Sequence, residues 1–132
     1  GILERDLRKV LEQEPDHAQA LNALGYTLAD ETTRYDEAFE LISKAYELMP
    51  ESAAILDSMG WVHYRRGNLE EALVFLRKAA AADDDGEIAA HLGEVYWVKG
   101  QRDEAMKVWM DALQRDPENS HVISTMERLQ AK

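Results

Sequence analysis

Four histidines have the broadest chemical repertoire in this sequence, because imidazole can act as a base, an acid or a metal ligand near neutral pH. They are His17, His63, His91 and His121. No two lie four residues apart, and no H-E-x-x-H pattern occurs, so the spacing that holds a zinc ion is missing. A catalytic base also needs a partner that orients it, and none is evident. We therefore predict no catalytic residue, no metal site and no cofactor.

The acidic run 83–86, Asp-Asp-Asp-Gly, briefly resembles a calcium-binding loop. An EF-hand aligned on its glycine would need an acid at Ala81 and a glutamate at Leu92, and both are absent. The alternative is the start of a helix, with Asp84 and Glu87 at the spacing of a capping box. We expect this run to begin a helix.

Composition restricts the class of protein further. The chain has 132 residues, 45% of them hydrophobic, a net charge of −11 and no cysteine. The hydrophobic fraction predicts a folded core. Because there is no cysteine, disulfides and thiolate sites are excluded. The negative charge disfavours nucleic acid and anionic membrane surfaces as partners. No run of about 18 apolar residues occurs, so we expect no direct membrane insertion by this segment.

Three series of small residues recur with a period near 34. Successive members lie 33, 34 or 35 residues apart. A small residue at a helix crossing lets the two axes approach to about 8 Å. The period therefore predicts helical hairpins that stack because none can bury its apolar stripe alone. The nine packing positions are Gly25, Gly60 and Gly93; Ala38, Ala72 and Ala105; and Ala45, Ala79 and Ala112.

Prolines and glycines place the ends of the helices. Pro15, Pro50 and Pro117 each follow a predicted helix, and Gly67 and Gly100 suit left-handed turns inside two hairpins. The predicted helices are 2–14, 18–30, 35–48, 52–66, 69–82, 86–99, 102–115 and 119–130.

These helices predict a single array over 1–132. The segment 2–15 is then the second helix of a preceding repeat, and 120–130 is a C-terminal capping helix. The three repeats between them are 18–52, 53–85 and 86–119.

The period and its motifs resemble the tetratricopeptide repeat (TPR) family. Leu or Met precedes each glycine of the first series, and Ile42, Leu76 and Trp109 each follow an alanine by four residues. The resemblance implies an all-α superhelix (α-solenoid) of about eight antiparallel helices, whose first helices line a concave face that binds protein or peptide. The family's packing tyrosine is kept only as Tyr96, and His63 occupies that position in repeat two, where we expect it to be partly buried with its polar atoms satisfied.

Phase along the first helices predicts which residues face the groove. Tyr26, Trp61, Tyr64 and Trp97 would form an aromatic ladder, with Trp61 as the first anchor for a partner. The alternative is that these aromatics form the core between repeats. Asp57 would repel a carboxylate, so capture of chaperone C-termini is rejected. The predicted groove residues are Asn22, Tyr26, Asp57, Trp61, Tyr64, Arg65, Glu94 and Trp97, with Asp30, Ala90, Ser124 and Arg128 beside them.

The segments 21–30, 55–64 and 87–97 are similar in detail to the C-terminal repeats of long proteobacterial TPR lipoproteins. That resemblance implies a location on the periplasmic side of the outer membrane, with a cytoplasmic location as the alternative. It also implies an adaptor that presents cell-wall hydrolases to a carboxy-terminal processing protease.

Three functions follow as hypotheses. The leading one is a non-enzymatic scaffold that binds a protein segment in its concave groove. The second is a self-associating module, a homo-oligomer that packs through its end helices. The third is an enzyme accessory domain. The end-helix residues are Ile2, Leu3, Leu7, Val122, Met126 and Leu129.

Overall fold

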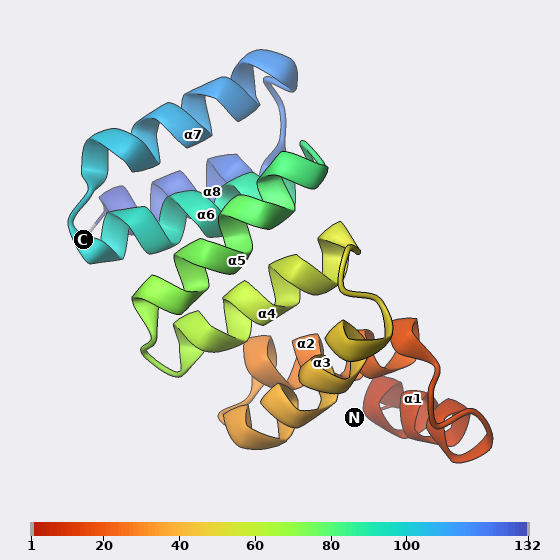
Figure 1. The fold of residues 1–132 in the computed structure, drawn as a ribbon. Coiled ribbons are helices and arrows are strands. Elements are labelled where there is room, and N and C mark those ends of the chain that lie inside the picture. The colour runs from red at the N-terminus through yellow and green to blue at the C-terminus, as the bar shows by residue number, and fades with distance from the viewer. Residues whose placement is uncertain (1, 132) are drawn as a thin grey trace.

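The computed structural model describes residues 2–131, and these fold into eight α-helices that pack in antiparallel pairs (Figure 1). Gly1, Lys132 and the side chain of Ile2 lie outside the described part. The all-α prediction is confirmed, and every predicted helix bound lies within one residue of the observed one. The helices are α1 (Ile2–Gln13), α2 (Ala18–Glu31), α3 (Tyr35–Leu48), α4 (Ala53–Arg65), α5 (Leu69–Ala82), α6 (Gly86–Lys99), α7 (Arg102–Arg115) and α8 (Ser120–Gln130).

Within each pair the two helices meet at a glycine. A Cβ atom on Gly25 would lie 2.5 Å from Cγ1 of Ile42, and one on Gly60 would lie 2.5 Å from Cγ of Leu76. At Gly93 the atom would collide with the indole of Trp109, which is fully buried. The large residue of each second helix therefore fills the space that the glycine leaves. All six alanines of the other two series are buried as well.

The turns follow from local chemistry. Gly67 and Gly100 have φ angles of 85° and 94°, a conformation that side chains with a Cβ rarely adopt. The prediction for the acidic run is partly wrong. Helix α6 does start at Gly86, but its N-cap is Asp85, whose Oδ1 accepts from the Glu87 amide at 2.7 Å. Asp84, the expected cap, is instead 3.7 Å from the Arg115 guanidinium.

The first helices of the pairs share one face. Helix α2 packs on α4, α4 contacts α6, and α6 packs on α8. The second helices α3, α5 and α7 lie on the other side of this row (Figure 1). No helix of residues 2–131 is both long and apolar enough to cross a lipid bilayer.

Candidate protein-binding groove

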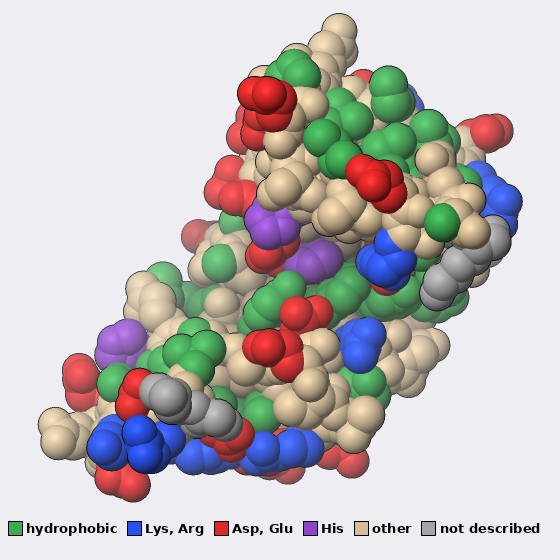
Figure 2. Space-filling model, turned by 180° about the vertical axis from the view of Figure 1, so that it is seen from behind, with side chains coloured by type: hydrophobic (Ala, Val, Ile, Leu, Met, Phe, Trp, Pro, Cys, Tyr) green, Lys and Arg blue, Asp and Glu red, His purple; other side chains and the backbone are tan. Residues whose placement is uncertain are grey.

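The residues predicted for the groove all lie on first helices of the pairs. Helix α2 contains Asn22 and Tyr26, α6 contains Glu94 and Trp97, and α4 contains the other four, Asp57, Trp61, Tyr64 and Arg65. Figure 2, seen from behind, shows acidic, basic and histidine side chains together in the middle of the molecule, and a row of Lys and Arg side chains along the lower edge. The middle of the face is therefore mixed in charge.

A chain of three polar side chains joins the first three helices of this face. His91 Nδ1 on α6 donates to Asp57 Oδ1 on α4 at 2.9 Å, and the Tyr26 hydroxyl on α2 lies 3.3 Å from His91 Nε2. His91 and Asp57 are only 8% and 4% exposed. Burial alone would lower the pKa of His91, but the charge and hydrogen bond of Asp57, together with the charges of Glu87 and Glu94, outweigh burial and raise the pKa.

This chain has the order of a nucleophile, a base and an orienting carboxylate. Burial raises the pKa of Tyr26 above its ordinary value, and the charges of Glu87, Asp30, Asp57 and Glu31 raise it further. The three side chains join α2, α4 and α6 through polar contacts.

Trp61 lies beneath the surface of the face, where it is 5% exposed. Its ring stacks on His91 with the ring centroids 4.0 Å apart, and its Nε1 donates to Asp30 Oδ1 at 3.2 Å. The expectation of an exposed Trp61 anchor is therefore wrong. The imidazole of the next repeat covers the indole, so Trp61 belongs to the core between repeats.

Glu94 forms the centre of a second polar group. It is 5% exposed, accepts from the Tyr64 hydroxyl at 2.8 Å, and pairs with Arg128 of α8 at 2.5 Å. Burial and the Glu94 charge raise the pKa of Tyr64. Asp57 and Glu94 were expected as open charges lining the groove, and the structure corrects both to buried, paired carboxylates. The buried Asp57 side chain is therefore not the open charge that was expected to repel a carboxylate.

The remaining groove residues keep part of their surface open. Arg65 is exposed and its Nε donates to the Ala29 carbonyl at 3.1 Å. Trp97 is half-buried, with its ring 5.6 Å from that of Trp109 and the Arg102 guanidinium 4.4 Å from its centroid. Tyr26, Tyr64 and Asn22 are half-buried too. These residues are the accessible part of the predicted set.

The role of His91 in joining repeats was not predicted from the sequence. One signal was available, because Asp57 and His91 lie 34 residues apart, as do Glu94 and Arg128. That spacing is one repeat, so side chains on neighbouring first helices fall side by side. His63 also differs from its prediction. It is half-buried between Phe39 and Phe75, but its Nδ1 is buried without a partner in the described chain, and burial lowers its pKa.

Two relatives are similar to this chain in sequence. A TPR repeat-containing protein of Pseudomonas aeruginosa is 62% identical over 92 residues, which are 70% of this chain and 16% of that protein. A TPR repeat-containing protein of Methanocaldococcus jannaschii is 30% identical over 77 residues, which are 58% of this chain and 14% of that protein. The chain thus spans only a small part of the length of these relatives.

Solved structures and family models agree on the fold. A thermophilic TPR protein of Thermus thermophilus superposes with a TM-score of 0.81 at 21% identity, covering 98% of this chain and 72% of the other. The protein MamA gives a TM-score of 0.75 at 23% identity, covering 96% and 74%. Two tetratricopeptide repeat models match residues 16–85 and 63–129. The first match alone spans more than half of the sequence, and the chain belongs to the tetratricopeptide repeat family.

Proposed function

We propose that this chain is a non-enzymatic scaffold that binds a protein segment along the face formed by α2, α4 and α6. Proteins of this family are generally modules for protein–protein interaction. The observation that carries the proposal is the pair of polar groups around His91 and Glu94, which fix neighbouring first helices to one another. The half-exposed rings of Tyr26, Tyr64 and Trp97 are therefore held in place before binding, which reduces the entropy lost on association.

The division into repeats is part of this proposal. The pairs α2–α3, α4–α5 and α6–α7 fall inside the segments 18–52, 53–85 and 86–119. Helix α1 would then complete a preceding hairpin within 2–15, and α8 would cap the array within 120–130.

The test removes the accessible aromatic surface. Tyr64→Ala combined with Trp97→Ala should reduce the capture of partner proteins from extracts of the protein's own organism, measured by crosslinking and mass spectrometry. Val74→Ala combined with Met110→Ala is the matched control, because both side chains are exposed apolar residues of second helices. Circular dichroism would check that both variants keep their helices. Equal capture by the two variants would contradict the proposal.

A finer proposal concerns the partner and its compartment. The resemblance of segments 21–30, 55–64 and 87–97 supports an adaptor on the periplasmic side of the outer membrane, acting for a carboxy-terminal processing protease and its substrates. The similarity to a longer Pseudomonas aeruginosa protein is compatible with this assignment. Copurification of such a protease with the full-length protein is the test, and its absence from a crosslinked membrane fraction would count against the adaptor role.

A second candidate function is self-association through α1. Leu3 is 55% exposed there, whereas Val122 and Leu129 of α8 are buried against the core and Met126 packs beside them. Leu129→Asp would therefore damage the fold, and Leu3→Asp is the cleaner variant. If α1 joins two copies, light scattering should show a loss of dimer mass in Leu3→Asp.

A further inference from the structure

A cavity of about 220 Å³ opens where α2 and α4 face the start of α6. Four carboxylates line it: Asp57 from α4, Asp83 and Asp85 from the loop before α6, and Glu87 from the first turn of α6. No lysine or arginine is among its lining residues. Two histidines are the basic side chains nearest to these carboxylates: His91 pairs with Asp57, and His121 Nδ1 lies 3.7 Å from Glu87 Oε2.

Buried polar atoms at the cavity also lack partners. Ser58 lines it and is 3% exposed. Asn22 lines it from α2, with a buried Oδ1 that has no partner within residues 2–131. Asp57 is 4% exposed and receives one donor, His91 Nδ1, although a carboxylate can accept several. Buried acceptors without donors are costly, so these atoms favour a ligand that donates hydrogen bonds.

Helix capping explains only part of the acidic character. Asp85 caps α6, and Glu87 lies in its first turn, where the helix dipole favours negative charge. Asp83 is instead the C-cap of α5, where the dipole disfavours negative charge. Asp83 is exposed, so its carboxylate is open to a ligand at the rim of the cavity.

We propose that this cavity is a subsite for a basic side chain, lysine or arginine, of the protein segment bound on the concave face. A guanidinium or ammonium group would donate to Asp57, Asn22 and Ser58 and would neutralise the carboxylates at the rim. Tyr26 lines the same cavity and offers an aromatic ring to the cation. This inference rests on the proposed function, since it names one side chain of the segment that the face holds.

The probe is N-acetylarginine amide, with N-acetyllysine amide as a second basic probe and N-acetylglutamine amide as the neutral control. Titration into the ¹⁵N-labelled chain should move the backbone amide signals of Ser58 and Glu87 in a saturable manner for a basic probe only. Asp83→Asn combined with Glu87→Gln should weaken that binding by about threefold to tenfold. Asp103→Asn combined with Glu104→Gln removes the same charge from exposed sites on α7 and should leave the affinity unchanged.

Several results would overturn the subsite. They are equal shifts with the neutral probe, equal weakening by the α7 control, and movement of the same signals by calcium chloride at lower concentration than by either basic probe. The proposed function can be separated from this test. If the basic probes do not bind while the Tyr64 and Trp97 variant still loses captured proteins, the subsite is wrong and the binding face stands. The opposite pattern would remove the binding face and leave a cation-binding cavity.

Discussion

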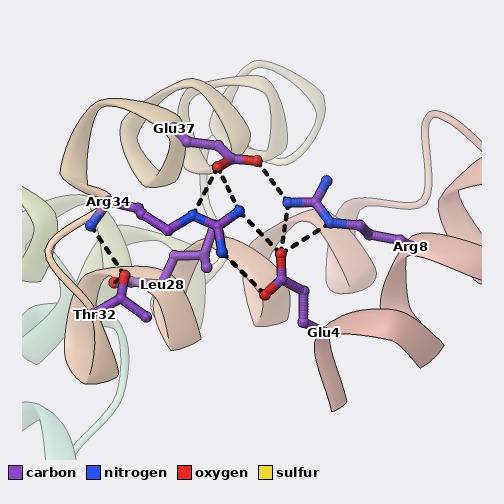
Figure 3. A network of polar contacts seen from close by, with 6 residues as sticks. All are labelled: Glu4, Arg8, Leu28, Thr32, Arg34 and Glu37. Carbon is purple, nitrogen blue, oxygen red and sulfur yellow. Dashed lines mark hydrogen bonds and ion pairs between the residues drawn. The ribbon is translucent and has the colours of Figure 1, made fainter. Parts of the chain in front are cut away.

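Two groups of charged side chains join helices in this molecule, and they differ in their access to water. At the N-terminal end, Glu4 and Arg8 of α1 meet Arg34, the N-cap of α3, and Glu37 in its first turn (Figure 3). Their ion pairs span 2.6 to 3.0 Å, but the two arginine side chains are 41% and 45% exposed. In the middle of the array, the side chains of His91 and Asp57 are 10% and 6% exposed at a similar distance of 2.9 Å.

The distance between the charged atoms alone does not rank the contributions of these contacts to stability. Water and salt screen the exposed group, so each of its pairs contributes little. The buried pair is not screened, and removing one partner leaves the other desolvated and unpaired. We therefore expect α1 to be held by salt-sensitive contacts, while the central first helices depend on buried ones.

The largest effect should come from breaking the buried pair. Asp57→Ala leaves His91 without its acceptor and should lower the free energy of unfolding by about 2–3 kcal/mol, because His91 can limit the loss by giving up its proton. Urea unfolding followed by circular dichroism measures this. Asp111→Ala is the control, since it removes the same charge from an exposed site on α7. An equal loss of unfolding free energy in both variants would show that the buried carboxylate contributes no more to stability than an exposed one.

A smaller loss is expected at the second buried carboxylate. Arg128→Gln leaves Glu94 with the Tyr64 hydroxyl as its remaining donor, so the free energy of unfolding should fall by about 1–2 kcal/mol. Lys107→Gln, at an exposed position of α7, provides the matched loss of a positive charge. Thermal unfolding of both variants would detect the difference, and unchanged stability of Arg128→Gln would show that Tyr64 alone satisfies Glu94.

The buried pair should also make stability depend on pH. The pKa of His91 in the folded chain lies above its ordinary value of 6.5. The stability that the His91–Asp57 pair contributes is therefore fully present below that ordinary pKa. It is lost as the pH rises through the pKa of His91 in the folded chain. Urea unfolding at about pH 6 and at about pH 9 should show lower stability at the higher pH. His91→Gln should reduce this difference, and a difference that persists in full would assign it to other groups.

The exposed ion pairs at the N-terminal end should have the smallest effect on stability. That effect should be visible mainly in the titration of Glu4. Hydrogen bonds from Arg34 and then Arg8 lower the pKa of Glu4 from 4.5 to about 2. The contribution of Glu4 to stability is present above its ordinary pKa. It disappears as the pH falls through the pKa of Glu4 in the folded chain. In 1 M salt, where the Debye length is about 3 Å, NMR titration of the Glu4 carboxyl carbon should return its pKa towards the ordinary value. A pKa that stays low would mean that salt does not screen this group.

Local features of the sequence were enough to predict the helices. Pro15 and Gly100 act through their own backbone geometry, so they place helix ends without knowledge of the rest of the fold. Periodicity added the contacts within a hairpin, as for Gly60 and Leu76, because both helices of one repeat are close in sequence.

Contacts between repeats were harder to predict. The position of Trp61 along α4 predicted a groove residue. Its burial depends instead on His91 of the next repeat, whose imidazole on α6 stacks on the indole. The cap at Asp85 depends on where the chain leaves α5, a matter of one residue. The burial of Trp61 and the choice of N-cap both depend on how neighbouring helices approach one another. The spacing of residues along a single helix does not specify that approach.

Two double-mutant cycles measure the difference between the buried and the exposed ion pairs, one between Asp57 and His91 and one between Arg8 and Glu37. Urea unfolding of Asp57→Asn, His91→Gln and the double variant should give a coupling energy of about 1–3 kcal/mol that persists in 1 M salt. The Arg8→Gln and Glu37→Gln cycle should give a smaller coupling that salt removes. Equal couplings with equal salt dependence would contradict the claim that buried polar contacts, rather than exposed ones, hold the central first helices together.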